Sequence, residues 1–406
     1  MRRIGLSFLM IVCLKMESQQ IGNYINNGSF EATYYCHQPN YSSIAKFWSN
    51  IDSNKYAGSY CSTCVNLANV PINTNTFQYP KNGNAYVLGT FFDMTANSQR
   101  AYLKNRLKKE LLAGKVYCVK FYVNIANTST YGMDGFGIYF GSSLLDTISK
   151  CTLPLSYISP QIQNANNNII SDTLNWVPIT GTFVASGLEK YALVGNFKSN
   201  GSVATSLINP TYLPTVFTDA CIDAVSCIEV NLPAYAGLDK SIIIGDSAYI
   251  GRESDFAVDK GCIWYKLPNM TTSIDTISGL WVKPTITTTY VVRQELDCSS
   301  TKWDTVVVHM NLVGLEKLKL LSEELKVYPI PAQDFLELKI TNSELFKDFN
   351  SLSIYNSLGQ LIREEEISFK DGAVKIKTDD FQQGVYSLQV KSKNAEAINK
   401  RFVISR

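Results

Sequence analysis

The chain has 406 residues, with 37 lysines and arginines, 35 aspartates and glutamates, and a formal net charge of +2. This balance excludes attraction of nucleic acid or of an anionic membrane surface by bulk charge. Only two histidines are present, His37 and His309, which leaves little material for histidine-based catalysis. No Gly-rich phosphate loop, nucleophile elbow or His-x-x-x-His metal pattern occurs in the sequence. The length predicts two to four domains, and the 23 Tyr and 19 Phe residues favour β structure.

The N-terminus has the pattern of a signal peptide. Arg2 and Arg3 precede an apolar run at 4–14, which is too short to span a bilayer. We assign residues 1–19 to this signal and expect cleavage near 18–20. Removal of residues 1–18 leaves a neutral chain. No later stretch reaches eighteen apolar residues, so no transmembrane helix is expected.

Residues 20–230 are predicted to form the first module, a β-sandwich of the jelly-roll type with one inserted helix. The helix is predicted over 99–112, where Leu103, Leu107 and Leu111 recur every four residues among Lys and Arg. Strands are expected at 115–125, 135–140, 176–185, 190–197 and 220–226, with further strands earlier in the module.

The two ends of this module carry a resemblance. An Asn-x-Gly-x-Phe-Glu opening at 26–31 and an Ile-Asp-x-Val close at 222–225 resemble the ends of a galactose-binding-like jelly roll, as in many carbohydrate-binding modules. In that fold the first and last strands are neighbours, so Glu31 and Asp223 could supply oxygens to a structural Ca²⁺. Ala224 replaces a second Asp of the family's closing motif. The alternative is that both carboxylates accept hydrogen bonds from loop N–H groups.

A sugar site requires an exposed aromatic side chain beside polar groups, because a pyranose ring has apolar faces and hydroxyl-bearing edges. The candidates in or beside predicted loops are Trp48, Tyr131 with Asp134, and Trp176. For each aromatic residue the alternative is a packing role in the core.

Nine cysteines follow the signal peptide, and export makes disulfides plausible. Cys262 and Cys298 lie in one later module and are predicted to pair. Seven cysteines then remain in the first module, so at least one thiol there stays free or pairs outside it. Cys61 and Cys64 have zinc or redox spacing, but no second ligand pair accompanies them. A disulfide-pinned loop that joins Cys36 to one of these two residues is favoured over zinc.

Residues 231–313 are predicted to form a second sandwich, since short strands recur at regular spacing. An Ala-Gly-x-Asp start at 236–239, Thr-Thr-Tyr at 288–290 and Asp-x-Val-x-Val at 304–308 resemble bacterial immunoglobulin-like or PKD-like repeats. Trp264 is expected in the core of this module. The resemblance implies a spacer role.

A charged link over 314–325 is predicted to be helical, because Leu315, Leu318 and Leu321 recur among Glu and Lys. Residues 326–406 are predicted to form a small third β-sandwich, which makes the fold class all-β with three sandwich modules in series. Prolines at 329 and 331 lack the N–H of a strand ladder and indicate a strand entry or edge. Asn and Gly at 356–359 indicate a hairpin turn.

Three motifs in this last segment resemble the type A sorting domain of the type IX secretion system, which exports proteins across the outer membrane of some Gram-negative bacteria. They are Val-Tyr-Pro-x-Pro at 327–331, Ile-Tyr-Asn-x-x-Gly-Gln at 354–360 and Gly-x-Tyr at 384–386. Ile330 stands where the family usually has Asn. The residues implied in sorting are Pro329, Pro331, Asn356, Gly359, Gly384 and Tyr386. The resemblance implies the type IX machinery as partner, and a location outside the cell or on its outer surface.

Two function classes follow. The first is an exported, non-catalytic binding protein that recognises a glycan or another extracellular polymer, as an adhesin does. The second is a structural component of the surface or matrix that binds no small ligand. Enzyme activity is not expected, because no spacing pairs the carboxylates that a glycosidase needs.

Overall fold

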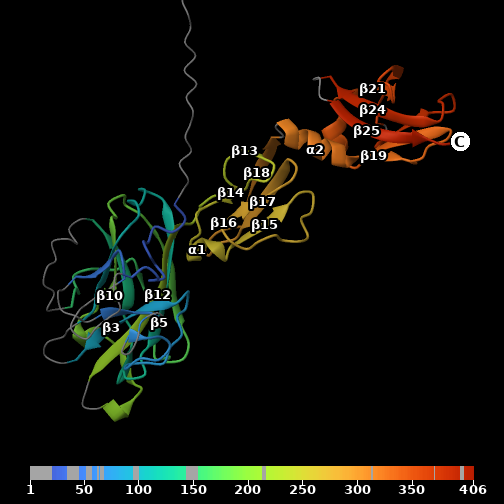
Figure 1. The fold of residues 1–406 in the computed structure, drawn as a ribbon. Helices are drawn as coiled ribbons and strands as arrows, with labels where there is room; N and C mark the ends of the chain where they lie inside the picture. Colours follow the sequence, from blue (N-terminus) through green and yellow to red (C-terminus); the bar gives the residue numbers. More distant parts are fainter. Residues whose placement is uncertain are drawn as a thin grey trace, which may run out of the picture. The chain divides into compact units, whose positions relative to one another are not determined.

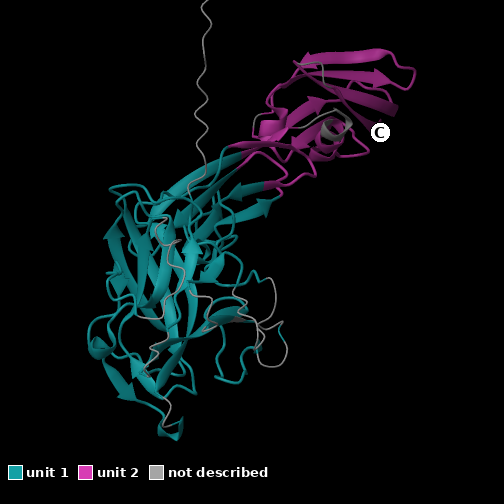
Figure 2. Ribbon diagram, turned by 90° about the vertical axis from the view of Figure 1, so that its left-hand side faces the viewer, with its two compact units in different colours: residues 1–238, 249–282, 289–307 teal, residues 239–248, 283–288, 308–406 magenta. Residues whose placement is uncertain are grey.

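The computed structural model of the protein describes residues 21–33, 45–51, 57–61, 64, 68–94, 100–142, 154–212, 216–311, 314–369, 371–393 and 397–406. The predicted signal peptide and Cys36 lie outside these residues. The chain divides into two compact units, coloured separately in Figure 2. Unit 1 comprises 1–238, 249–282 and 289–307, and unit 2 comprises 239–248, 283–288 and 308–406.

The N-terminal module, residues 21–230, is a sandwich of two five-stranded sheets, drawn from blue to green in Figure 1. Its central strand β12 is buried along nearly its whole length, which agrees with its run of apolar residues. One sheet has the order β2-β3-β12-β5-β9: Ala57–Cys61, Ala85–Asp93, Phe217–Glu229, Val116–Ile125 and Val177–Val184. The other has the order β1-β4-β10-β7-β8: Trp48–Asn50, Leu103–Arg106, Tyr191–Asn196, Phe136–Gly141 and Ile162–Gln163.

The core between these sheets is aromatic. Tyr86, Phe91 and Phe121 come from one sheet and Phe136 and Phe140 from the other, and all are buried. Burial of such large side chains contributes most of the hydrophobic stabilisation of a sandwich. Smaller elements complete the module: the ladder β6 (Tyr131–Met133) with β11 (Thr205–Leu207), and the 3₁₀ turns η3 (Asn200–Ser202) and η4 (Pro210–Tyr212).

The predicted inserted helix is wrong. Strand β4 occupies the middle of that segment, and no helix is present in the described residues 100–112. Leu103, Leu107 and Leu111 are all buried, as the prediction required. A four-residue spacing also fits a two-residue period, and Asn105 is buried between Leu103 and Leu107 while Arg106 is exposed. Pairing with β1 and β10 therefore decided the conformation.

The middle module, residues 231–311, is built mainly from β strands. Trp264 is completely buried and its indole N–H donates to the Ile277 carbonyl at 2.7 Å, as expected for a core tryptophan. Its sheets have the orders β13-β18-β17-β15 (Lys240–Ile243, Lys302–Asn311, Thr288–Gln294, Cys262–Lys266) and β14-β16 (Ala248–Gly251, Gly279–Val282). The short helix α1, Phe256–Asp259, begins at an Asp255 cap.

The C-terminal module, residues 314–406, opens with helix α2, Gly314–Glu324, as predicted. Leu321 of this helix is completely buried in the module's core, so the segment is part of the module and not a free link. Its sheets have the orders β19-β20-β23 (Leu325–Tyr328, Phe335–Ile340, Ala373–Lys377) and β22-β21-β24-β25 (Leu361–Glu366, Phe349–Asn356, Gly384–Ser392, Ala397–Ile404), with η5 at Ser343–Phe346.

No helix in the described part of the chain is long and apolar enough to cross a bilayer.

Candidate functional sites

Trp48 begins strand β1 and serves the core. Its side chain is buried, its ring packs on Phe30 with centroids 4.9 Å apart, and its indole N–H donates to the Asn27 carbonyl at 2.9 Å. A tryptophan held in this way presents no open face to a sugar.

Tyr131 and Asp134 lie at the two ends of one short stretch that contains β6. Tyr131 is half-buried, while Asp134 is fully buried. The Asp134 carboxylate accepts N–H bonds from Asn167 and Ala204, each at 2.8 Å, and pairs with the Lys198 ammonium at 2.5 Å. These contacts satisfy the charge inside the protein and fix three loops.

Trp176 directly precedes β9 and is half-buried. Its indole N–H donates to the Tyr79 carbonyl at 2.9 Å, and its ring meets the edge of Tyr86. Trp48 and Tyr131 begin strands of two different sheets, and Trp176 directly precedes a strand of a third sheet. The contacts of these candidates therefore favour the packing alternative over a shared sugar platform.

A groove of about 1150 Å³ lies elsewhere on the N-terminal module and was missed by the sequence analysis. Phe47 and Tyr191 contribute aromatic rings, and Phe47 is 60% exposed. The cationic side chains of the groove are Arg106, Lys108, Lys109 and Lys190, against the one carboxylate of Glu110. The sequence contains a signal for these cations in the basic residues that follow Leu103, but a helix over 99–112 would place them on its polar face.

Glu31 and Asp223 both accept hydrogen bonds from the backbone of the turn at 81–85. The Glu31 carboxylate accepts N–H bonds from Asn84 and Ala85 at 2.9 and 3.2 Å. Asp223 accepts from Lys81 and Asn82 at 2.8 and 3.0 Å and from its neighbour Ala224 at 2.5 Å. A bulge in β12, with Ala224 at a φ of 52°, turns Asp223 toward this loop.

Burial raises the pKa of both carboxyl groups, and the nearby charge of Glu31 adds to the rise for Asp223. Three of their four oxygens already accept N–H bonds, which compete with coordination of a cation. No group of three or more His, Cys, Asp or Glu side chains in the described residues could hold a metal ion. The contacts therefore fit the role of backbone acceptors better than that of calcium ligands, and calcium remains an untested prediction.

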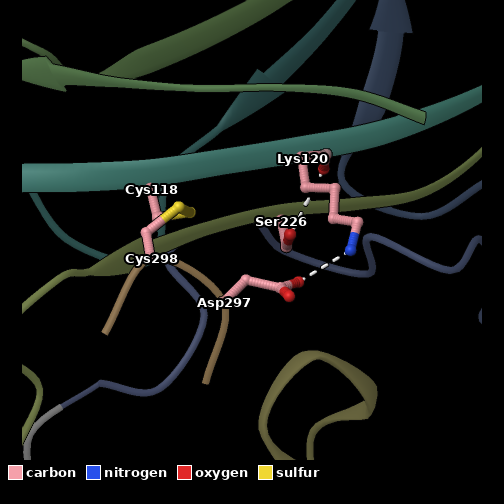
Figure 3. The surroundings of a disulfide bond; sticks show 5 residues. All are labelled: Cys118, Lys120, Ser226, Asp297 and Cys298. Carbon is pink, nitrogen blue, oxygen red and sulfur yellow. Dashed lines mark hydrogen bonds and ion pairs between the residues drawn. A yellow bond between two sulfur atoms is a disulfide. The ribbon is translucent and has the colours of Figure 1, made fainter. Parts of the chain in front are cut away.

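The predicted pairing of Cys262 with Cys298 is wrong. Cys298 forms a disulfide with Cys118 of strand β5 (Figure 3), with Cα atoms 6.0 Å apart. Cys262 is a buried free thiol. Pairing depends on distance in the fold, and the loop after β17 brings Cys298 to the N-terminal module. Lys120 lies beside the disulfide and pairs with Asp297 at 2.7 Å. The middle module is thus linked covalently to the N-terminal module within unit 1.

The remaining cysteines agree with the expectation of free thiols in the first module. Cys221 and Cys227 are free and completely buried, and burial raises the pKa of both thiols well above the usual range. Such thiols stay protonated and are poor nucleophiles. Cys64 is disulfide-bonded, which removes it as a thiolate ligand for zinc.

The motifs of the C-terminal module meet at one end of a sheet. Asn356 closes β21 and Gly384 opens β24, and their strands pair so that Asn356 lies opposite Tyr386. The Asn356 carbonyl accepts from the N–H of Gly359, which has a φ of 80°, as the predicted hairpin turn requires. Asn356, Gly359 and Tyr386 line a groove of about 540 Å³ together with Asn399 and Arg401.

Pro329 and Pro331 follow strand β19, and both are preceded by cis peptide bonds. Ala332, next in the chain, donates to the Val403 carbonyl at 2.7 Å. The two prolines thus occupy the turn that joins β19 to β20, consistent with the edge position predicted for them.

Comparison with known proteins agrees with this last module. Residues 326–405 match the family described as "Secretion system C-terminal sorting domain". The chain therefore carries a type IX sorting domain and is an exported protein. No curated protein matches the sequence.

Several solved structures are similar to parts of the chain. A structure titled "CBM4 structure and function" is 13% identical over 50% of this chain and 99% of its own, with a TM-score of 0.23. The CBM22-1 xylan-binding domain from Paenibacillus barcinonensis Xyn10C is 10% identical over 46% and 98%, also at 0.23. A DUF3244 family protein from Bacteroides vulgatus, with an immunoglobulin-like β-sandwich fold, is 15% identical over 20% and 84%, at 0.18. Scores of this size assign neither fold nor ligand, so the architecture rests on the strand orders above.

Proposed function

We propose that this protein is an exported, non-catalytic binding protein whose N-terminal module recognises a glycan or another extracellular polymer. The observation that supports the proposal is the groove beside Phe47 on that module. An aromatic side chain that is 60% exposed lies there next to several polar and charged groups. This is the combination that carbohydrate recognition requires, because a ring covers the apolar face of a sugar while polar groups bind its hydroxyls.

The core of the same module supports a rigid scaffold for binding. Its two sheets enclose a continuous aromatic core, and a disulfide and an ion pair fix the middle module to it. A preorganised surface loses less conformational freedom on binding than a flexible one does. Release from the cell and attachment to its outer surface are both compatible with this role.

Binding of the purified full-length chain to a glycan array tests the proposal. We expect binding to at least one polysaccharide, and an about tenfold weaker affinity for the variant Phe47→Asn. Asn tolerates the positive φ of 69° at this position, so the turn is kept while the ring is lost. The matched control is Tyr157→Asn, which removes a ring that is 74% exposed in the same module but outside the groove. A chain that binds no glycan would favour the structural role instead.

A further inference from the structure

The groove beside Phe47 has a charge that suggests a particular ligand. Four of its side chains, those of Arg106, Lys108, Lys109 and Lys190, are cationic, in a chain whose overall charge is close to zero. Lys108 pairs with Asp255 at 3.0 Å and Lys190 pairs with Glu110 at 2.8 Å. Among the described residues, neither Arg106 nor Lys109 has a carboxylate partner. Two exposed cations are therefore available to an anionic ligand.

The groove brings aromatic and cationic groups together. Trp48 pairs with Asn105, and Tyr191 pairs with Arg106 on the other side of β4. Phe47 immediately precedes β1 in a turn with a positive φ, outside the strand ladder, and it lines the same groove as Arg106 and Tyr191. Residues level with one another in a sheet point to the same face, so Arg106 and Tyr191 share one face of this sheet.

The turn that carries Phe47 is held rigidly by hydrogen bonds. Asn27 donates to the Lys46 carbonyl at 3.0 Å, and Asn105 donates to the Phe47 carbonyl at 3.1 Å. Asn105 also exchanges hydrogen bonds with the backbone of Asn26. This network keeps the Phe47 backbone at a positive φ, which is costly for a large side chain. A strained backbone that projects an apolar ring into solvent is typical of a functional position.

We propose that this groove binds an acidic polysaccharide, one whose sugars carry carboxylate or sulfate groups. The exposed Phe47 ring covers a sugar face, and the Arg106 guanidinium in the same groove pairs with the acidic group. Arginine suits that task because its planar fork can donate two parallel hydrogen bonds to a carboxylate. Lys109 adds attraction that depends on ionic strength. The inference rests on the proposed glycan-binding function and names its ligand class.

A comparison of polygalacturonate with its methyl ester distinguishes recognition of charge from recognition of sugar shape. The two polymers have the same sugar backbone, but the ester lacks the free carboxylate. We expect the full-length chain to bind polygalacturonate at least tenfold more tightly than the methyl ester, with an advantage that shrinks as salt is added. The double variant Arg106→Gln/Lys109→Gln should weaken binding to polygalacturonate about tenfold and leave binding to the ester unchanged. Heparin in place of polygalacturonate tests sulfate as the acidic group.

The matched control is Lys266→Gln/Lys283→Gln, which removes two exposed cations of the middle module and the same total charge. It should bind polygalacturonate as the unaltered chain does, and equal loss in both double variants would overturn the proposal. Equal affinity for the acidic polymers and the ester, or binding of neutral glycans alone, would overturn the acidic ligand but leave the glycan-binding function intact. Failure to bind any glycan would overturn both.

Discussion

Cys118 and Cys298 form a disulfide that joins strand β5 of the N-terminal module to the loop after β17, across 180 residues of sequence. A crosslink over so long a loop removes much conformational freedom from the unfolded chain. Peptide mapping without reductant should recover the Cys118–Cys298 peptide. A Cys262–Cys298 peptide would contradict the structure and restore the pairing expected from the sequence.

Removal of the Cys118–Cys298 disulfide should lower the free energy of unfolding. We expect Cys298→Ser to destabilise unit 1 by about 2 to 5 kcal/mol, measured as a lower melting temperature. Asp297→Ala is the matched control, since it breaks the adjacent ion pair with Lys120. The Asp297 side chain is 64% exposed, so that change should cost less than about 1 kcal/mol. Equal effects of the two variants would argue against the crosslink as the main contribution.

The buried carboxyl group of Asp219 should make the stability of the folded protein depend on pH. Burial raises the pKa of this carboxyl to about 6, despite the 2.6 Å hydrogen bond from the Thr90 hydroxyl. The folded state therefore prefers the protonated acid, and this stabilisation is complete below about pH 4 and is lost as the pH rises through 6. Asp219→Asn should raise the melting temperature at pH 7 but not at pH 4, equivalent to about 2 to 3 kcal/mol. The exposed Asp246→Asn should change neither, and a parallel shift at both pH values would contradict this account.

Glu31 and Asp223 give a test of the calcium prediction. Since their oxygens already accept N–H bonds from the turn at 81–85, we expect the melting temperature to be the same with calcium and with a chelator. Glu31→Ala should lower it in both conditions, because two backbone donors lose their acceptor. A midpoint that falls only when the chelator is present would instead establish a calcium site.

Leu321 tests the assignment of helix α2 to the C-terminal module. Its side chain is completely buried in that module's core, so Leu321→Ala should destabilise unit 2 by about 2 to 5 kcal/mol. The neighbouring exposed Lys319→Ala should lie within about 0.5 kcal/mol of the unaltered chain. Similar small effects of both changes would show that helix α2 is a linker and not part of the C-terminal module.

The sequence predicted what depends on local pattern. The all-β class, the core position of Trp264, the helix over 314–324 and the turn at Asn356 were all expected, because strand alternation, helical spacing and turn residues act over a few positions. The three motifs of the sorting domain were found for the same reason, since each lies within a few residues.

What could not be predicted depends on contacts between distant residues. The spacing of Leu103, Leu107 and Leu111 fits a strand as well as a helix, and pairing with β1 and β10 decided between them. The partner of Cys298 is 180 residues away. The groove joins Phe47, Arg106 and Tyr191 from three separate segments, so the basic run after Leu103 could not by itself indicate the aromatic residues beside it.

Export through the C-terminal module is the central claim, and a deletion in the native host tests it most directly. The full chain and a chain that lacks residues 326–406 would be compared by cell fractionation and by protease treatment of intact cells. We predict that the full chain reaches the surface or the medium, where its intact mass lacks the C-terminal module, and that the shortened chain stays in the periplasm. Normal appearance of the shortened chain outside the cell would contradict the account.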